Sequence, residues 1–239
     1  MRFLFLLILS LPANAEILSV HCPLGCPSNP DGNDLIFGHV YALSNNPETK
    51  FADWVAYEVN VLNFGVSPGR PWKSDPLLDD SETLEKSDYG NVSSIDADRG
   101  HQAPLDSFAD SHYWHELNYL SNITPQHKNL NQGAWKNLEG AVRAAVKFRE
   151  SLFVITGTIY NNNALELPNA NETHEILTEY FKIIYNLKGE AASFPMEQST
   201  PRNPDYCSKQ KPISEVVIKT GFNLPVLSNS TAVANQVGC

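Results

Sequence analysis

The chain has 239 residues and carries 17 basic against 27 acidic side chains, a formal net charge of −10. A surface this acidic repels polyanions at long range, so it excludes a nucleic-acid binder that relies on a generally basic surface. Any such site must be a local basic cluster. The length allows one large domain with a sizeable core.

The first 15 residues have the form of a secretory signal peptide. Arg2 gives a positive start, residues 3–11 are apolar, and Ala13-Asn14-Ala15 is a small-x-small cleavage site. This apolar run of nine residues is too short to span a bilayer, which needs about 20. We therefore expect cleavage after Ala15, export, no membrane association, and one domain over residues 16–239. Cleavage would leave 16 basic and 27 acidic residues, a net charge of −11.

Four cysteines in an exported chain predict two disulfides, and four permit three pairings. Cys22 and Cys26 lie together near one end, and Cys207 and Cys239 lie near the other. Proximity along the chain therefore favours Cys22–Cys26 and Cys207–Cys239. A zinc site at Cys22-x3-Cys26 is disfavoured, because no second Cys or His pair follows at finger-like spacing.

Strands are predicted at residues 35–43 and 54–62, which are rich in β-branched and aromatic residues. Residues 65–94 are dense in Gly, Pro, Ser and Asp and are predicted to be mostly surface loop. Further strands are expected at residues 151–160 and 176–186, with a loop between them.

The clearest predicted helix begins near Asn131. Its apolar residues recur at spacings of three and four and form one stripe: Ala134, Trp135, Leu138, Ala141, Val142, Ala145 and Val146. A second helix is expected from Ile213 to about Thr220. Strands on both sides of one long helix predict an α+β domain built on a central, mainly antiparallel sheet.

The sequence Asp98-Arg99-Gly100-His101 places a carboxylate, a permanent cation and a potential base within four residues. Histidine titrates near neutrality and can accept a proton from water. Arginine presents a planar fork suited to phosphate oxygens. Taken alone, such a string is more often a surface turn with an ion pair.

A second stretch changes this interpretation: Asn122-Ile-Thr-Pro-Gln126, then Leu130-Asn-Gln-Gly-Ala-Trp135 and Glu139. Four further features accompany the two motifs, namely the Cys22-x3-Cys26 opening, Phe51-Ala-x-Trp-Val-Ala-Tyr57, Trp72-Lys-x-Asp-Pro76 and the late cysteine pair. Together they resemble the DNA/RNA non-specific endonucleases of the ββα-metal (His-Me finger) group. The resemblance covers essentially the whole mature chain.

This resemblance implies a secreted bacterial endonuclease, extracellular or periplasmic, that cuts single- and double-stranded DNA and RNA to 5′-phosphate products. The implied fold is the ββα-metal nuclease fold, with its long helix carrying the metal ligand. The implied cofactor is Mg²⁺, with Mn²⁺ as the alternative. DNA and RNA would be the substrates, and the protein would be a monomer or homodimer.

Individual roles also follow from the resemblance. His101 matches the general base that activates water. Asn131 matches the direct protein ligand of the metal, and Glu139 matches the carboxylate that holds metal-bound waters. The remaining matches are phosphate-binding arginines and supporting residues: Arg99 and Arg70 for the former, and Asp98, Asn122, Gln126 and Arg143 for the latter.

Helix geometry agrees with part of this assignment. In an unbroken helix, residues eight apart are offset by about 80° and about 12 Å, so Asn131 and Glu139 can face one cleft without gripping one ion directly. Magnesium usually keeps several waters, which suits an outer carboxylate. Glu139 and Arg143, at i and i+4, are expected to pair.

Alternatives remain at this point. His112-x-x-His115 invites a zinc interpretation, but no general-base Glu of the HExxH type lies between the histidines. A narrower phosphodiesterase would share the motifs. A catalytically silent nucleic-acid binder or secreted adhesin would have no need of His101, Asn131, Glu139 and Arg99 together.

Overall fold

The computed structural model describes residues 17–161, 166–203 and 205–239. The predicted signal peptide and the Ala15 cleavage site lie outside these residues, so they stay predictions. The single domain expected over residues 16–239 also stays a prediction. Part of the loop predicted between residues 160 and 176 also lies outside the described residues. None of the helices in the described part of the chain is long and apolar enough to cross a membrane.

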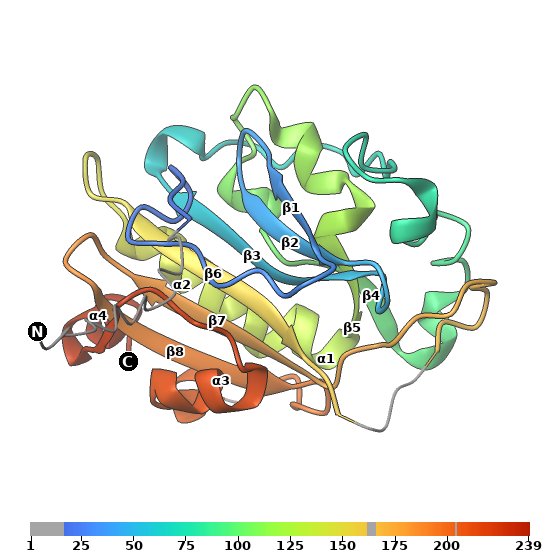
Figure 1. Ribbon diagram of the computed structural model, residues 1–239. Coiled ribbons are helices and arrows are strands. Elements are labelled where there is room, and N and C mark those ends of the chain that lie inside the picture. Colours follow the sequence, from blue (N-terminus) through green and yellow to red (C-terminus); the bar gives the residue numbers. More distant parts are fainter. Residues whose placement is uncertain (1–16, 162–165, 204) are drawn as a thin grey trace, which may run out of the picture.

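A seven-stranded sheet forms the centre of the molecule, in the order β1-β2-β3-β6-β7-β8-β9 (Figure 1). Every pairing is antiparallel except the short parallel contact of β8 with β9. The strands are β1 Asp34–Phe37, β2 Ala42–Asn46, β3 Phe51–Val59, β6 Leu152–Ile159, β7 Glu179–Tyr185, β8 Glu190–Glu197 and β9 Ser228–Asn229. The predicted α+β class with a mainly antiparallel central sheet is confirmed.

Both faces of the sheet are covered, which is why its central strands carry apolar residues on both faces. Helix α2, Lys136–Ala145, lies behind the sheet, and α3, Ile213–Thr220, lies in front of it (Figure 1). In β7, Tyr180 and Ile184 belong to the core cluster that contains α2, while Phe181 and Ile183 belong to the cluster that contains α3. A strand buried on two sides cannot alternate between apolar and polar residues.

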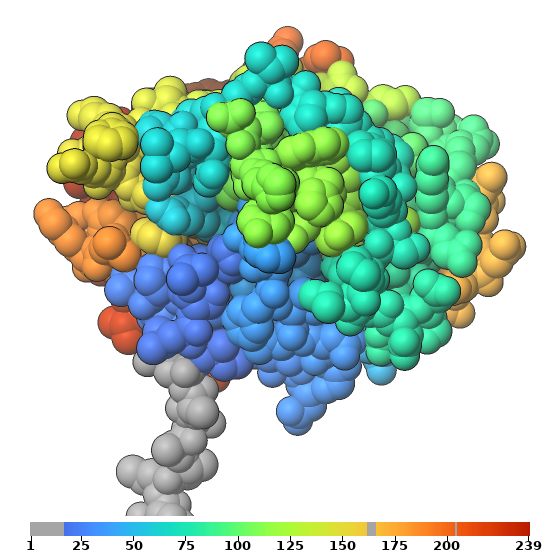
Figure 2. All heavy atoms as spheres, turned by 90° about the horizontal axis from the view of Figure 1, so that it is seen from above, coloured from blue at the N-terminus to red at the C-terminus, as the bar shows by residue number. Residues whose placement is uncertain are grey.

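A separate two-stranded ribbon stands apart from this sheet. It pairs β4, Ala97–His101, with β5, Ile123–His127, in antiparallel register. The connection between β3 and β5 covers much of one face of the molecule and is coloured cyan to green in Figure 2. Residues 65–94 are mostly loop as predicted, with two short 3₁₀ turns at Asp80–Glu82 and Val92–Ile95.

Several predicted boundaries were wrong. The single strand expected at residues 35–43 is two strands, because the chain turns at residues 38–41 and pairs Phe37 with Ala42. The strand expected at 54–62 begins at Phe51 and ends at Val59. The helix at Ile213–Thr220 is confirmed.

The helix predicted from Asn131 is not continuous. A short helix α1, Lys128–Leu130, leads into a π-helical segment, Asn131–Trp135, and α2 follows. Gly133 breaks the regular geometry with φ −114° and ψ −116°. The offset calculated for an unbroken helix between Asn131 and Glu139 is therefore wrong, because a kink lies between them.

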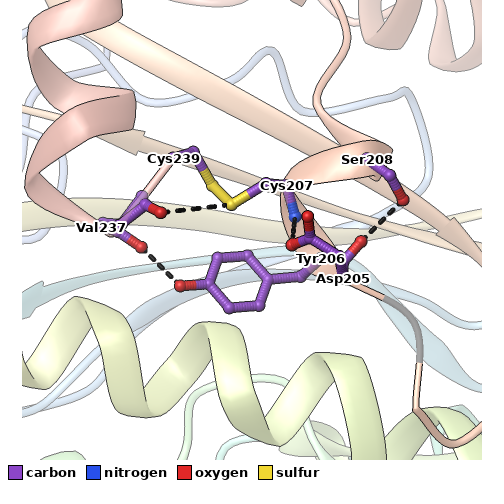
Figure 3. Close-up of a disulfide and its surroundings, with 7 residues drawn as sticks. Asp205, Tyr206, Cys207, Ser208, Val237 and Cys239 are labelled. Atoms are coloured by element: carbon purple, nitrogen blue, oxygen red, sulfur yellow. Dashed lines mark hydrogen bonds between the residues drawn. A yellow bond between two sulfur atoms is a disulfide. The ribbon is translucent and has the colours of Figure 1, made fainter.

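Both predicted disulfides are confirmed, as Cys22–Cys26 and Cys207–Cys239. Figure 3 shows the second bridge joining the 3₁₀ helix Tyr206–Lys209 to the end of the chain after α4, Thr231–Gln236. Beside the bridge, the Tyr206 hydroxyl donates to the Val237 carbonyl at 2.6 Å. The bridge thus holds a short helix against the sheet.

Loop length predicts unequal contributions from the two bridges. The Cys207–Cys239 pair spans 32 residues and the Cys22–Cys26 pair spans four. In the chain-entropy description, removing them costs roughly 3.5–4 and about 2 kcal/mol respectively. Urea unfolding of Cys207→Ala/Cys239→Ala and of Cys22→Ala/Cys26→Ala measures the difference. Equal losses would contradict the entropic account.

Candidate active site

The β4–β5 ribbon delivers the Asp98–His101 motif to a cleft. Arg99 pairs with Pro125, and His101 pairs with Ile123. Gly100 leaves room for the Gln126 side chain, since a Cβ at residue 100 would lie 2.6 Å from Oε1 of Gln126. The predicted supporting residue Gln126 therefore packs across the backbone of the motif.

The cleft has a volume of about 510 Å³. Six of the predicted site residues line it: Arg70, Asp98, Arg99, His101, Asn131 and Glu139. Asn122, Gln126 and Arg143 do not. Asn122 is fully buried, and its side chain bonds Ala103 N, Ala103 O and Leu117 O at 2.8–3.0 Å. It fixes the chain that follows His101.

His101 is held by Asn118, at a distance of 3.2 Å between Nε2 and the amide oxygen Oδ1. An amide oxygen only accepts, so Nε2 carries the proton and Nδ1 is left with a free lone pair. Burial is the main cause that lowers the pKa of His101, to about 4, and the nearby Arg70 cation lowers it further. The Asn118 hydrogen bond and Asp106 act in the opposite direction. The imidazole is therefore neutral at physiological pH.

Sequence reasoning missed Asn118. It ends the 3₁₀ helix Trp114–Asn118, and the whole residue is buried. One signal was available: an asparagine between Leu117 and Leu120, both buried, needs a polar partner inside the protein. The sequence did not show that this partner is His101.

Arg99 lies between two aromatic rings. Its guanidinium carbon is 5.6 Å from the Trp72 ring centroid and 5.8 Å from that of Tyr89, and Nη2 donates to the Tyr89 carbonyl at 3.2 Å. Its Nε is buried and has no hydrogen-bond partner among the described residues. A guanidinium that packs against aromatic rings in the lining of a cleft suits an anionic ligand.

Cations gather locally in the cleft despite the acidic chain. Arg70 and Lys136 are exposed residues of its lining, and Arg99 is half-buried there. Lys136 was not predicted. These three cations share the lining with the carboxylates of Asp98, Asp106 and Glu139. The expected basic cluster is therefore not a region of net positive charge, and phosphate binding depends on where each cation lies.

Asn131 is oriented by Asp98. The amide Nδ2 of Asn131 donates to Asp98 Oδ2 at 2.9 Å, and Gln132 Nε2 donates to the same oxygen at 2.8 Å. A carboxylate only accepts, so the nitrogen of the Asn131 amide must face Asp98. The amide oxygen Oδ1 is then left available as a ligand.

Glu139 reaches the cleft from α2, and its side chain is 14% exposed. The cation nearest to it is Lys182, with Nζ 3.9 Å from Oε1. The predicted pair with Arg143 was wrong: within the described chain no ion pair of 4.0 Å or less joins them, and one Arg143 nitrogen is buried without a partner. Burial raises the pKa of Glu139, while Lys182 and then Arg143 act to lower it.

The oxygen donors present fit magnesium better than zinc. No group of three or more His, Cys, Asp or Glu side chains that could enclose a metal occurs in the described residues. The zinc interpretation of His112 and His115 therefore lacks a further ligand. An amide oxygen with one outer carboxylate suits an ion that keeps several waters.

The sequence profile of the DNA/RNA non-specific endonuclease family matches residues 21–229. The chain is 38% identical to a nuclease of Serratia marcescens over 225 residues, which cover 90% of this chain and 85% of that protein. It is 26% identical to human mitochondrial endonuclease G over 79% of this chain and 64% of that protein. In a crystal structure of an EndoG/EndoGI complex, one chain has the same fold, with a TM-score of 0.73 at 20% identity, covering 87% of this chain and 94% of that one.

Substitution by alanine should change the stability of the fold in opposite directions at two glycines, Gly133 and Gly140. A Cβ at Gly133 would lie 2.1 Å from the carbonyl oxygen of Arg202, whereas at Gly140 the nearest atom is 3.9 Å away. Gly133→Ala should destabilise the fold by roughly 1–3 kcal/mol through overpacking. Gly140→Ala, inside α2, should stabilise it by about 0.5–1 kcal/mol.

Chemical denaturation of the two variants against the parent protein measures both signs. A Gly133→Ala protein as stable as the parent would contradict the close approach of residue 202 to the kink.

Proposed function

Because the chain belongs to the DNA/RNA non-specific endonuclease family, we propose that it cuts single- and double-stranded DNA and RNA with His101 as the general base. Membership makes it an endonuclease that hydrolyses nucleic acids. The roles of individual residues, the metal and the site of action form the proposal.

The observation that carries the proposal is the His101–Asn118 contact. In this contact Nε2 donates its hydrogen to Asn118, so Nδ1 of the neutral imidazole remains as an acceptor in the cleft wall. A base in this state can take a proton from a water molecule as that water attacks phosphorus. The arginine pair supports the assignment, since Arg99 and Arg70 line the same cleft and can bind phosphate oxygens as negative charge develops.

Asn131 and Glu139 would hold Mg²⁺, the amide oxygen directly and the carboxylate through bound water, and Mn²⁺ is the expected substitute. When bound, the ion supplies positive charge beside the phosphate and the departing 3′ oxygen. Asp98 keeps the Asn131 amide turned so that its oxygen remains free. Departure of the 3′ oxygen leaves 5′-phosphate ends.

Little sequence preference is expected from this site. Its cationic residues are suited to phosphates, and backbone contacts carry no base information. Two disulfides fit an oxidising compartment, and we propose that the protein is exported by its signal peptide to the periplasm or the medium.

Plasmid cleavage tests the activity. The purified protein should nick closed-circular plasmid and degrade RNA with MgCl2, and EDTA should stop both reactions. His101→Ala should lower turnover on the order of 10²–10⁴-fold, the usual contribution of a general base, with an unchanged melting temperature.

Two results would contradict the proposal in different ways. Failure to nick plasmid would exclude a non-specific endonuclease and leave a narrower phosphodiesterase. Nearly full activity of His101→Ala would exclude His101 as the base.

The pH profile tests the environment of His101. A base acts when deprotonated, so kcat/KM should fall as the pH drops through about 4, and not through the ordinary value of 6.5. Asn118→Asp keeps an acceptor for Nε2 and adds negative charge, which raises the pKa of His101. The acidic limb of kcat/KM should then move to higher pH. A parent profile with its acidic limb near 6.5 would rule out a desolvated His101.

A further inference from the structure

A lysine occupies the interior of the protein at the centre of β7. Lys182 is 1% exposed and lies between Tyr180 and Ile184 on the face of the sheet that packs against α2. Burying an ammonium group is costly unless it is paired and hydrogen-bonded. An apolar residue would serve the packing of this face equally well, so the charge requires a separate explanation.

The Lys182 ammonium is held at a fixed point by groups from two neighbouring strands and from the π-helical segment. It donates to Thr156 Oγ1 of β6 at 2.7 Å and to the Tyr57 hydroxyl of β3 at 2.9 Å. It also lies 4.4 Å from the centroid of the Trp135 ring. These contacts remove the freedom that a lysine side chain has on the surface.

The Lys182 ammonium is also close to Glu139, a residue that lines the cleft. Nζ lies 3.9 Å from Oε1 of Glu139, on α2 above the sheet. Of all the cations in the described residues, Lys182 is the one within 4.0 Å of this carboxylate. Glu139 is therefore approached by a rigid positive charge from the core side, while its other side faces the cleft.

We propose that Lys182 is a positioning residue for the nuclease reaction, and that its buried ammonium fixes the orientation of the Glu139 carboxylate from behind. The inference rests on the proposed role of Glu139 in holding metal-bound water. Lys182 itself is not among the residues that line the cleft, so it would act through Glu139. Residues that orient metal-binding groups in this way typically affect metal affinity or activity about 10–100-fold when replaced.

Lys182→Met tests the proposal, because methionine preserves the length of the side chain without its charge. The hydroxyl groups of Tyr57 and Thr156 lie 3.5 Å apart, so they can still hydrogen-bond to each other when the ammonium is removed. Plasmid nicking at saturating MgCl2 should fall about 10–100-fold. The MgCl2 concentration that gives the half-maximal rise in melting temperature, titrated without nucleic acid, should increase by a similar factor.

Ile184→Met is the matched control. Ile184 is the next residue on the same face of β7 and is also fully buried, but it belongs to the apolar core. Its variant should nick plasmid and respond to MgCl2 as the parent does. A similar loss in both variants would show that repacking of the strand, and not the lysine charge, changed the activity.

A double-mutant cycle with Glu139→Gln tests whether Lys182 affects the reaction through Glu139. If Lys182 acts through Glu139, Lys182→Met should cause no further loss in the Glu139→Gln background. Thr156→Val, which removes one anchor of the ammonium and keeps the charge, should show a smaller loss that also vanishes in that background. This variant keeps the test decisive if Lys182→Met does not fold.

Failure of the inference is distinguishable from failure of the proposed function. Parent protein that does not nick plasmid would overturn the function. Parent protein that nicks, together with a Lys182→Met protein that nicks as fast, or binds MgCl2 as tightly or more tightly, would overturn only the role of Lys182. Additive losses in the cycle would do the same.

Discussion

The hydrogen bond from Asn131 Nδ2 to Asp98 Oδ2, at 2.9 Å, is one of two that join the two parts of the site. It links the β4–β5 ribbon to the helical segment that leads into α2. It also determines which atom of the Asn131 amide is available as a ligand, because a carboxylate can accept a hydrogen bond only from the amide nitrogen. The kink at Gly133 and the close approach of residue 202 hold Asn131 where this bond can form.

The chemistry of the cleft depends on environments that differ over short distances. His101 is desolvated and kept neutral, while Arg99 is stacked between aromatic rings and Arg70 is exposed at the rim. A neutral base beside permanent cations is a useful combination, since the cations attract phosphate without donating a proton to the base. The acidic remainder of the molecule does not prevent this, because Coulomb interactions beyond about 10 Å are largely screened at 0.1 M salt.

The central sheet contributes to the site as well as to stability. The Lys182 ammonium places a positive charge under Glu139 that the surface could not hold at a fixed position. Arg143, the expected partner on the same helix, does not pair with Glu139; the nearby cation is Lys182, which lies 43 positions beyond Glu139 in the chain. The pairing of β7 with β6, which sets Lys182 opposite Thr156, decides where the ammonium sits.

Local sequence patterns were sufficient to predict the elements that local interactions stabilise. The apolar stripe from Ala134 to Val146 predicted α2 although it did not reveal the kink, and the helix Ile213–Thr220 matched in both boundaries. Loops dense in Gly and Pro were also predicted correctly. Strands β4, β5 and β8 were missed, since β4 carries charges and a glycine, and β5 and β8 each contain a proline. They are strands because of the partners they pair with, which no local propensity records.

The sequence by itself determined the family, the fold class, the two disulfides and six of the residues that line the cleft. Motif spacing carries that information, because the residue types needed for phosphate chemistry are few. Only the tertiary structure decided that Asn118 holds His101, that Asp98 turns Asn131, and that Lys182 rather than Arg143 lies against Glu139. Each of these contacts joins residues from different elements, and their distances depend on strand register and helix kinks that the linear order of residues does not express.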